Sequence, residues 1–120
     1  MKTGDTYKIK YVVTDTDTAE AIGSGGLPVY ATPAMICLME KTAYLAAAEA
    51  GLQTVGTKVN ISHLRACKAG TAVECTAEVT EVEGRRIMFS VKVSDNNGLI
   101  GEGMHERFSI DPERFLAKLA

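Results

Sequence analysis

The sequence predicts an α+β domain in which one antiparallel sheet wraps around a single long helix. Two observations predict this class. Residues 32–50 carry few charges and form one long helical pattern, whereas four runs of alternating apolar and polar side chains follow it. The helix and one face of the sheet both present apolar surface, and wrapping the sheet around the helix buries both. The length of 120 residues suits one domain, which we assign to residues 1–120.

The first elements are expected ahead of the apolar segment. Residues 7–13 alternate in polarity and predict a strand. Residues 14–28 are polar and then glycine-rich, which predicts a long loop of the kind that often forms a lid. The helix is expected to begin with Thr32 as its N-cap and Pro33 at its first position. It is expected to end near Gly51, a suitable residue just past a helix.

The second half of the chain is expected to supply the rest of the sheet. Strands are predicted at residues 54–63, 72–82, 87–93 and 99–110. EGRR at 83–86 and DNNG at 95–98 predict the turns between the last three strands. A short terminal helix is expected after Asp111 and Pro112. Because such a sheet has open edges, and open edges are usually paired or covered, we expect a dimer.

Composition narrows the classes of function. The net charge of −2 argues against a nucleic-acid or anionic-membrane partner. No apolar run approaches the roughly 20 residues that span a bilayer. The three cysteines form no CxxC pair and no apolar signal segment precedes them, so we expect reduced thiols in a cytoplasmic protein. Two histidines in separate strands form no zinc signature, so no metal is expected.

Glu40 is the first candidate for chemistry. Its neighbours at helical spacing are Ile36, Cys37, Ala43 and Tyr44, and none of them can pair with a charge. A carboxylate on an apolar stripe is costly unless it is used, and burial would raise its pKa. Glu40 is therefore a candidate base or nucleophile, or else a boundary residue whose carboxylate reaches water.

His63 and Thr32 are two further residues that could work with the Glu40 carboxylate. His63 ends a strand on its apolar face, where it is either a catalytic imidazole or a core histidine bonded to a backbone carbonyl. Cys67 is close enough to pair with it, although a buried cysteine is usually a small apolar residue. Thr32 either caps the helix or sets a hydroxyl beside the free amides of the helix N-terminus, which suit an oxyanion.

The segment GEGMHERF holds another candidate group. His105 and Arg107 would share a strand face with Gly101 and Gly103, and glycines there suggest close approach of a backbone or ligand. Arg107 could bind a carboxylate or phosphate. An exposed strand face with mixed charges is the alternative.

The chain resembles the fluoroacetyl-CoA thioesterase-like branch of the hotdog-fold superfamily in three segments. These are VYATPAMICLMEKTA at 29–43, GTKVNISHLRACKAG at 56–70, and VEGRRIMFSVKVSD with GLIGEGMHERF at 82–108. The resemblance implies a hotdog fold, a dimer with active sites at its interface, an acyl-CoA substrate, and no metal or redox cofactor. It implies catalytic roles for Thr32, Glu40 and His63, and it aligns Arg107 with the arginine of the family's GxHER motif.

Two departures separate this chain from the fluoroacetyl-CoA enzyme. That enzyme closes its pocket with a phenylalanine-rich lid, whereas residues 15–28 here contain no aromatic side chain. Pro33 stands where that enzyme has glycine, which removes one backbone N–H near the predicted oxyanion site.

The resulting hypothesis is a thioesterase that hydrolyses a small acyl-CoA and forms a homodimer, with a tetramer as a further possibility. The candidates for binding the CoA phosphates are basic residues: Arg65, Lys68, Arg85 and Arg86. The alternatives are a non-catalytic acyl-CoA binding protein and a hotdog enoyl-CoA hydratase or dehydratase.

Overall fold

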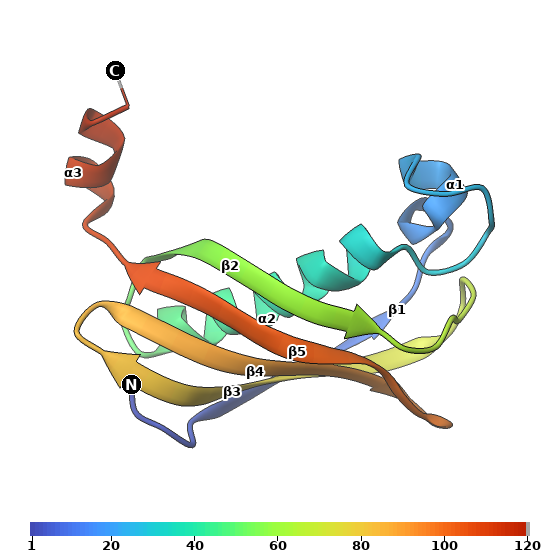
Figure 1. The fold of residues 1–120 in the computed structure, drawn as a ribbon, viewed down its shortest axis with the longest axis horizontal. Coiled ribbons are helices and arrows are strands. Elements are labelled where there is room, and N and C mark those ends of the chain that lie inside the picture. Colours follow the sequence, from blue (N-terminus) through green and yellow to red (C-terminus); the bar gives the residue numbers. More distant parts are fainter. Residues whose placement is uncertain (120) are drawn as a thin grey trace.

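The computed structural model describes residues 1–119, and in it five strands form one antiparallel sheet that curls around a long helix, α2 (Figure 1). The sheet order is β1-β3-β4-β5-β2, which leaves β1 and β2 at the two edges. This architecture confirms the predicted α+β class. The strands are β1 Thr6–Val12, β2 Thr54–His63, β3 Ala72–Glu83, β4 Arg86–Asp95 and β5 Gly98–Ser109.

Helix α2, Thr32–Glu49, supplies one side of the core. Its buried stripe packs on the inner face of the sheet, and Gly51 just past its end has a φ of 82°. Thr32 was predicted as the N-cap, but the N-cap is Ala31. Thr32 is the first helical residue, so its hydroxyl does not cap the helix. The buried stripe consists of Met35, Leu38, Met39, Thr42, Ala43, Ala46 and Ala47.

The segment predicted as a loop folds into two short helical turns. They are η1, Asp15–Asp17, and α1, Ala19–Ile22, and they lie near the N-terminal end of α2 (Figure 1). The Thr18 hydroxyl accepts a hydrogen bond from the Ala21 N–H and caps α1. The Ala31 N–H donates to the Asp17 carbonyl at 2.9 Å, which ties these turns to the start of α2.

A bulge in β2 changes which side chains face the helix. The register shifts between Gly56 and Lys58, so that Gly56 pairs with Arg107. The Thr57 hydroxyl consequently bonds Glu106 on the outer face of the sheet, at 2.8 Å from Oε1. Thr57 therefore does not share a face with His63, because one extra residue reverses the alternation along the strand.

The chain ends in helix α3, Pro112–Ala117, beyond the end of β5 (Figure 1). The predicted terminal helix is thus present, and Asp111 caps it, since its carboxylate accepts hydrogen bonds from the Glu113 and Arg114 amides. None of the helices within residues 1–119 is long and apolar enough to cross a bilayer.

Candidate active site

The first half of the candidate site is a pair formed by Thr32 and His63. Thr32 Oγ1 lies 2.8 Å from His63 Nδ1, which joins the start of α2 to the end of β2. The edge of the His63 ring faces the Tyr30 ring, with the ring centres 6.4 Å apart. Burial lowers the pKa of His63, so its ring is neutral at neutral pH and can accept a proton.

The second nitrogen of this imidazole has no partner. His63 Nε2 is buried, yet no group within residues 1–119 forms a hydrogen bond with it. A cavity of about 320 Å³ is lined by Thr32 and His63, with Ser24 and Ala31 before them and Leu64 and Arg65 after them. A buried imidazole nitrogen without a partner is the kind of group that a substrate, a water molecule or a second subunit completes.

The second half of the candidate site surrounds Glu40. Its Oε2 lies 3.7 Å from Arg107 Nη1 on β5, so its charge partner comes from the sheet and not from its own helix. The neighbours of Glu40 along its own helix gave no sign of a partner 67 positions later in the chain. In the single subunit the Glu40 side chain is 44% exposed, which fits the boundary alternative, whereas the Arg107 side chain is 7% exposed.

Arg107 is held from several sides. Its Nε–H donates to Thr54 Oγ1 at 2.8 Å and its Nη2 donates to the Thr54 carbonyl at 3.1 Å. The guanidinium carbon lies 5.8 Å from the centre of the Tyr44 ring. Gly56 provides clearance, because a Cβ there would lie 2.8 Å from Glu40 Oε2. Thr54, Tyr44 and Gly56 were not predicted, and only the unusual glycine within a strand signalled a close approach.

His105 on β5 is the last member of this group. It is 1% exposed, so the alternative of an exposed strand face is wrong for this segment. Its Nδ1 lies 2.8 Å from the Lys58 carbonyl and its Nε2 lies 3.1 Å from Arg107 Nη1. Burial lowers the pKa of His105 and also that of Arg107. Gly103 shows the predicted close approach, since a Cβ there would lie 2.2 Å from the Asn60 carbonyl oxygen.

A single subunit does not unite the two halves. Thr32 and Glu40 lie eight residues apart on α2, which separates them by about 12 Å along the helix axis.

Cys67 does not pair with His63. The hydrogen bond of His63 Nδ1 goes to Thr32 and not to Cys67. Burial raises the pKa of Cys67, which favours a protonated thiol and not the thiolate of a Cys–His pair.

The basic candidates for CoA binding fall into two groups. Arg65 lines the cavity beside Thr32, and its guanidinium pairs with Asp95. Lys68 is exposed in the same connection, where Val29 and Lys68 form an isolated bridge. Arg85 and Arg86 lie at the β3–β4 turn instead. Arg86 already contacts two carboxylates, at 3.1 Å from Glu81 and 2.6 Å from Glu106.

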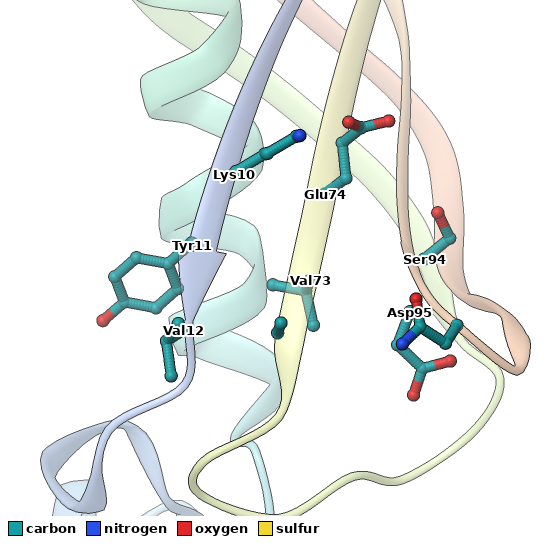
Figure 2. A pocket seen from close by; sticks show the side chains of 9 residues that line it. Lys10, Tyr11, Val12, Val73, Glu74, Ser94 and Asp95 are labelled. Atoms are coloured by element: carbon teal, nitrogen blue, oxygen red, sulfur yellow. The ribbon is translucent and has the colours of Figure 1, made fainter.

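A larger hollow of about 610 Å³ lies elsewhere, over β1, β3 and β4 (Figure 2). Lys10 and Glu74 are labelled there on neighbouring strands, with Ser94 and Asp95 beside them (Figure 2). The side chains that line it include neither Thr32, Glu40 nor His63, so the size of this hollow does not make it the reactive site. Within residues 1–119, no three side chains of the metal-binding types gather into a metal site.

Comparisons with known proteins place this chain in a family. The model of the fluoroacetyl-CoA-specific thioesterase family matches residues 13–113. A fluoroacetyl-CoA thioesterase from Streptantibioticus cattleyicolor is 40% identical over 94 residues, which cover 76% of this chain and 68% of that protein.

Solved structures show the same relationship. A fluoroacetyl-CoA thioesterase matches with a TM-score of 0.90 and 34% identity, over 99% of this chain and 95% of that one. A threonine-to-serine mutant of that enzyme, solved in complex with acetyl-CoA, matches with a TM-score of 0.92 and 32% identity over 99% and 96% of the two chains. A hot-dog-like protein from Thermanaerovibrio acidaminovorans is 22% identical with a TM-score of 0.89, over 99% and 90% of the two chains, which supports the hotdog fold. The chain thus belongs to the fluoroacetyl-CoA-specific thioesterase family and has the hotdog fold.

Proposed function

We propose that the protein hydrolyses a small acyl-CoA thioester to the acid and CoA, at a site shared by two subunits of a homodimer. The observation that carries this proposal is the Thr32–His63 pair at the start of α2, where His63 Nε2 forms no hydrogen bond with any group of residues 1–119. The kinship with acyl-CoA thioesterases supports the substrate class. The free cysteines fit a reducing compartment, so we place the protein in the cytoplasm.

The edge strand β2 supports the dimer. It pairs with β5 on one side only, and residues 56–60 in its middle are all exposed. In our proposal β2 pairs with its own copy about a two-fold axis near Val59 or Asn60. Antiparallel pairing of this kind sets His63 opposite residues 55–57 of the second copy. Because Glu40 lies beside Gly56, the partner subunit's Glu40 would then approach Thr32 and His63.

The start of α2 suits the oxyanion of the tetrahedral intermediate. Met35 N–H bonds the Ala31 carbonyl, and Pro33 has no N–H. The amides of Thr32 and Ala34 therefore remain as donors in the first turn, together with the Thr32 hydroxyl. These groups and the positive end of the helix dipole stabilise the negative charge that develops on the thioester oxygen.

The proposed reaction is an acyl transfer to water. The partner subunit's Glu40 takes a proton from water as the water oxygen bonds to the acyl carbon. Collapse of the tetrahedral intermediate then breaks the C–S bond. The departing CoA sulfur takes the proton that Glu40 removed from water, which passes through His63 Nε2, so that the ring returns to its neutral form and Glu40 to its carboxylate. In the second route Glu40 attacks the acyl carbon directly and forms an anhydride, as the C–S bond breaks and CoA leaves as a thiolate. Water then hydrolyses the anhydride to the acid and the Glu40 carboxylate, and the proton released goes to the CoA sulfur.

The surroundings of the site favour a small acyl group other than fluoroacetyl as the natural substrate. The segment 15–28, which contains α1, offers no aromatic side chain to close over the acyl group. We propose that Arg65 and Lys68 meet the CoA phosphates, because Arg65 lines the cavity and Lys68 is exposed three residues later in the same connection. The partner subunit's Arg107 would face the acyl end, because Arg107 pairs with Glu40 within each subunit. Arg85 and Arg86 would reach CoA only from the second subunit.

The test is thiol release from a panel of acyl-CoAs by the purified protein. Glu40→Gln should lower kcat roughly 10²–10⁴-fold, as loss of a general base does, while light scattering shows an unchanged dimer. Glu49→Gln is the matched control, since it changes an exposed carboxylate on the same helix. Turnover near the wild-type level in Glu40→Gln would refute the role of Glu40. Saturable binding without thiol release would favour the binding protein, and addition of water to an enoyl-CoA would favour the hydratase.

The shared site has its own test. Glu40→Gln and His63→Ala should each be inactive as homodimers, because each lacks one half of both sites. Coexpression should restore part of the activity, since a mixed dimer holds one intact site. Coexpressed dimers that stay inactive would show that the three residues act within one subunit or not at all.

A further inference from the structure

We propose that His105 is a positioning residue of this site, because its neutral ring holds the Arg107 guanidinium against the carboxylate of Glu40. The inference rests on the proposed function, in which Glu40 activates water or attacks the thioester. His105 itself lies beneath Arg107 and acts through it.

The hydrogen bonds of His105 fix its tautomer. The Lys58 carbonyl can only accept a hydrogen bond, so Nδ1, at 2.8 Å from it, carries the proton. A guanidinium can only donate, so Nε2, at 3.1 Å from Arg107 Nη1, carries none. The ring is thus neutral, protonated at Nδ1, and presents a lone pair to Arg107.

This lone pair settles the orientation of the guanidinium. Thr54 takes the Nε and Nη2 donors of Arg107, and His105 takes one of the two N–H groups on Nη1. The second Nη1 N–H is left for Glu40 Oε2, at 3.7 Å. Rotation of the guanidinium out of this plane would break hydrogen bonds to Thr54 and His105 together.

A fixed guanidinium matters because Glu40 is otherwise free to move. Its side chain is 44% exposed and only Arg107 forms an ion pair with it within residues 1–119. The groups that face the His105 ring are the Lys58 carbonyl from β2, Arg107 from β5 and Glu40 from α2. With a neutral ring, Arg107 is the one cation of this group, and its charge is directed at Glu40.

A purely structural role for His105 is the competing explanation. In that case the hydrogen bond from His105 Nδ1 to the Lys58 carbonyl matters, because it joins β5 to β2. The Nε2 atom that accepts from Arg107 does not matter. Two amide variants separate the roles. Asn at this position places its amide N–H near the position of Nδ1 and has no atom near the position of Nε2. Gln sets its terminal amide near the Nε2 position, where its oxygen can accept from Arg107.

The positioning role predicts a distinct kinetic pattern. His105→Asn should lower kcat roughly 10²-fold, the loss expected when a catalytic group shifts by about 1 Å, with little change in KM. His105→Gln should keep kcat within a few fold of the wild type, even if its melting temperature is the lower of the two. A structural role predicts the reverse order, with Asn the better substitute. Equal kcat values in Asn and wild type would overturn the proposal.

A second measurement does not depend on turnover. Long-range ¹H–¹⁵N spectra of the wild-type dimer should show His105 as the neutral ring protonated at Nδ1 at pH 7. A ring protonated at Nε2, or on both nitrogens, would overturn the inference whatever the kinetics. If the wild type hydrolyses no acyl-CoA, the proposed function fails, and the spectra still decide the tautomer.

Discussion

Gly103 should tolerate no side chain. A Cβ built there lies 2.2 Å from the Asn60 carbonyl oxygen and 2.6 Å from Ile61 Cα, and both atoms belong to the backbone of β2. A flexible side chain could move aside, but a paired strand cannot move without breaking its hydrogen bonds to β5. Gly103→Ala therefore forces β2 away from the sheet or distorts β5.

The cost of this change can be estimated. Overpacking of a well-packed interior costs about 1–3 kcal/mol, and a clash with backbone belongs at the upper end of that range. Alanine lowers the conformational entropy of the unfolded chain relative to glycine, which offsets only about 0.4–1 kcal/mol of this overpacking cost. A net loss of about 2 kcal/mol in the free energy of unfolding corresponds to a fall of roughly 8 °C in melting temperature for a domain of this size.

Urea denaturation and thermal melting of Gly103→Ala measure this loss directly. Gly26→Ala is the matched control, because a Cβ there meets nothing within 4 Å and its φ is not in the left-handed region. That variant should stay within about 0.5 kcal/mol of the wild type. If Gly103→Ala melts within about 2 °C of the wild type, which corresponds to about 0.5 kcal/mol, the close packing of β2 on β5 is wrong.

Two further predictions concern buried polar groups. The Tyr30 hydroxyl is buried and without a hydrogen-bond partner among residues 1–119, so Tyr30→Phe should be neutral or stabilising by up to about 1 kcal/mol in urea denaturation; a clear loss would reveal a hidden partner. Burial lowers the pKa of both His63 and His105 in the folded protein. Below the histidine pKa of the unfolded chain, about 6.5, the unfolded chain therefore binds more protons than the folded protein does. The free energy of unfolding should therefore fall as the pH drops from 6.5 toward 5, above the range where carboxylates titrate, and a flat profile there would contradict the burial of these rings.

Local pattern was enough to predict most of the fold. Alternation located all five strands, and the apolar run located α2, because each follows from side-chain periodicity within one element. The bulge at Gly56 and the two turns within residues 14–28 were missed. Both depend on a few backbone angles, and a single extra residue in β2 leaves no clear mark on the sequence.

The candidate site was predicted as residues but not as contacts. Thr32, Glu40 and His63 stood out by position, and the structure joins Thr32 to His63. The partner of Glu40 was missed because Arg107 reaches it through the register of β5 against β2, which a helical pattern on α2 does not encode. Arg107 and His105 lie on one face of β5, but their burial depends on α2 covering that face.

In the proposed homodimer, the position of the two halves on β2 makes dimerisation a requirement for catalysis. His63 ends the strand, whereas Gly56 near its start pairs with Arg107 and borders Glu40. A two-fold axis through the middle of an antiparallel strand pair places the start of one strand beside the end of the other. In the proposed dimer, Glu40 of one subunit would therefore approach His63 of the other at two sites, an arrangement that one subunit alone does not produce. Activity should accordingly fall with dimer dissociation on dilution, in proportion to the dimer fraction that ultracentrifugation measures; a fully active monomer would contradict it.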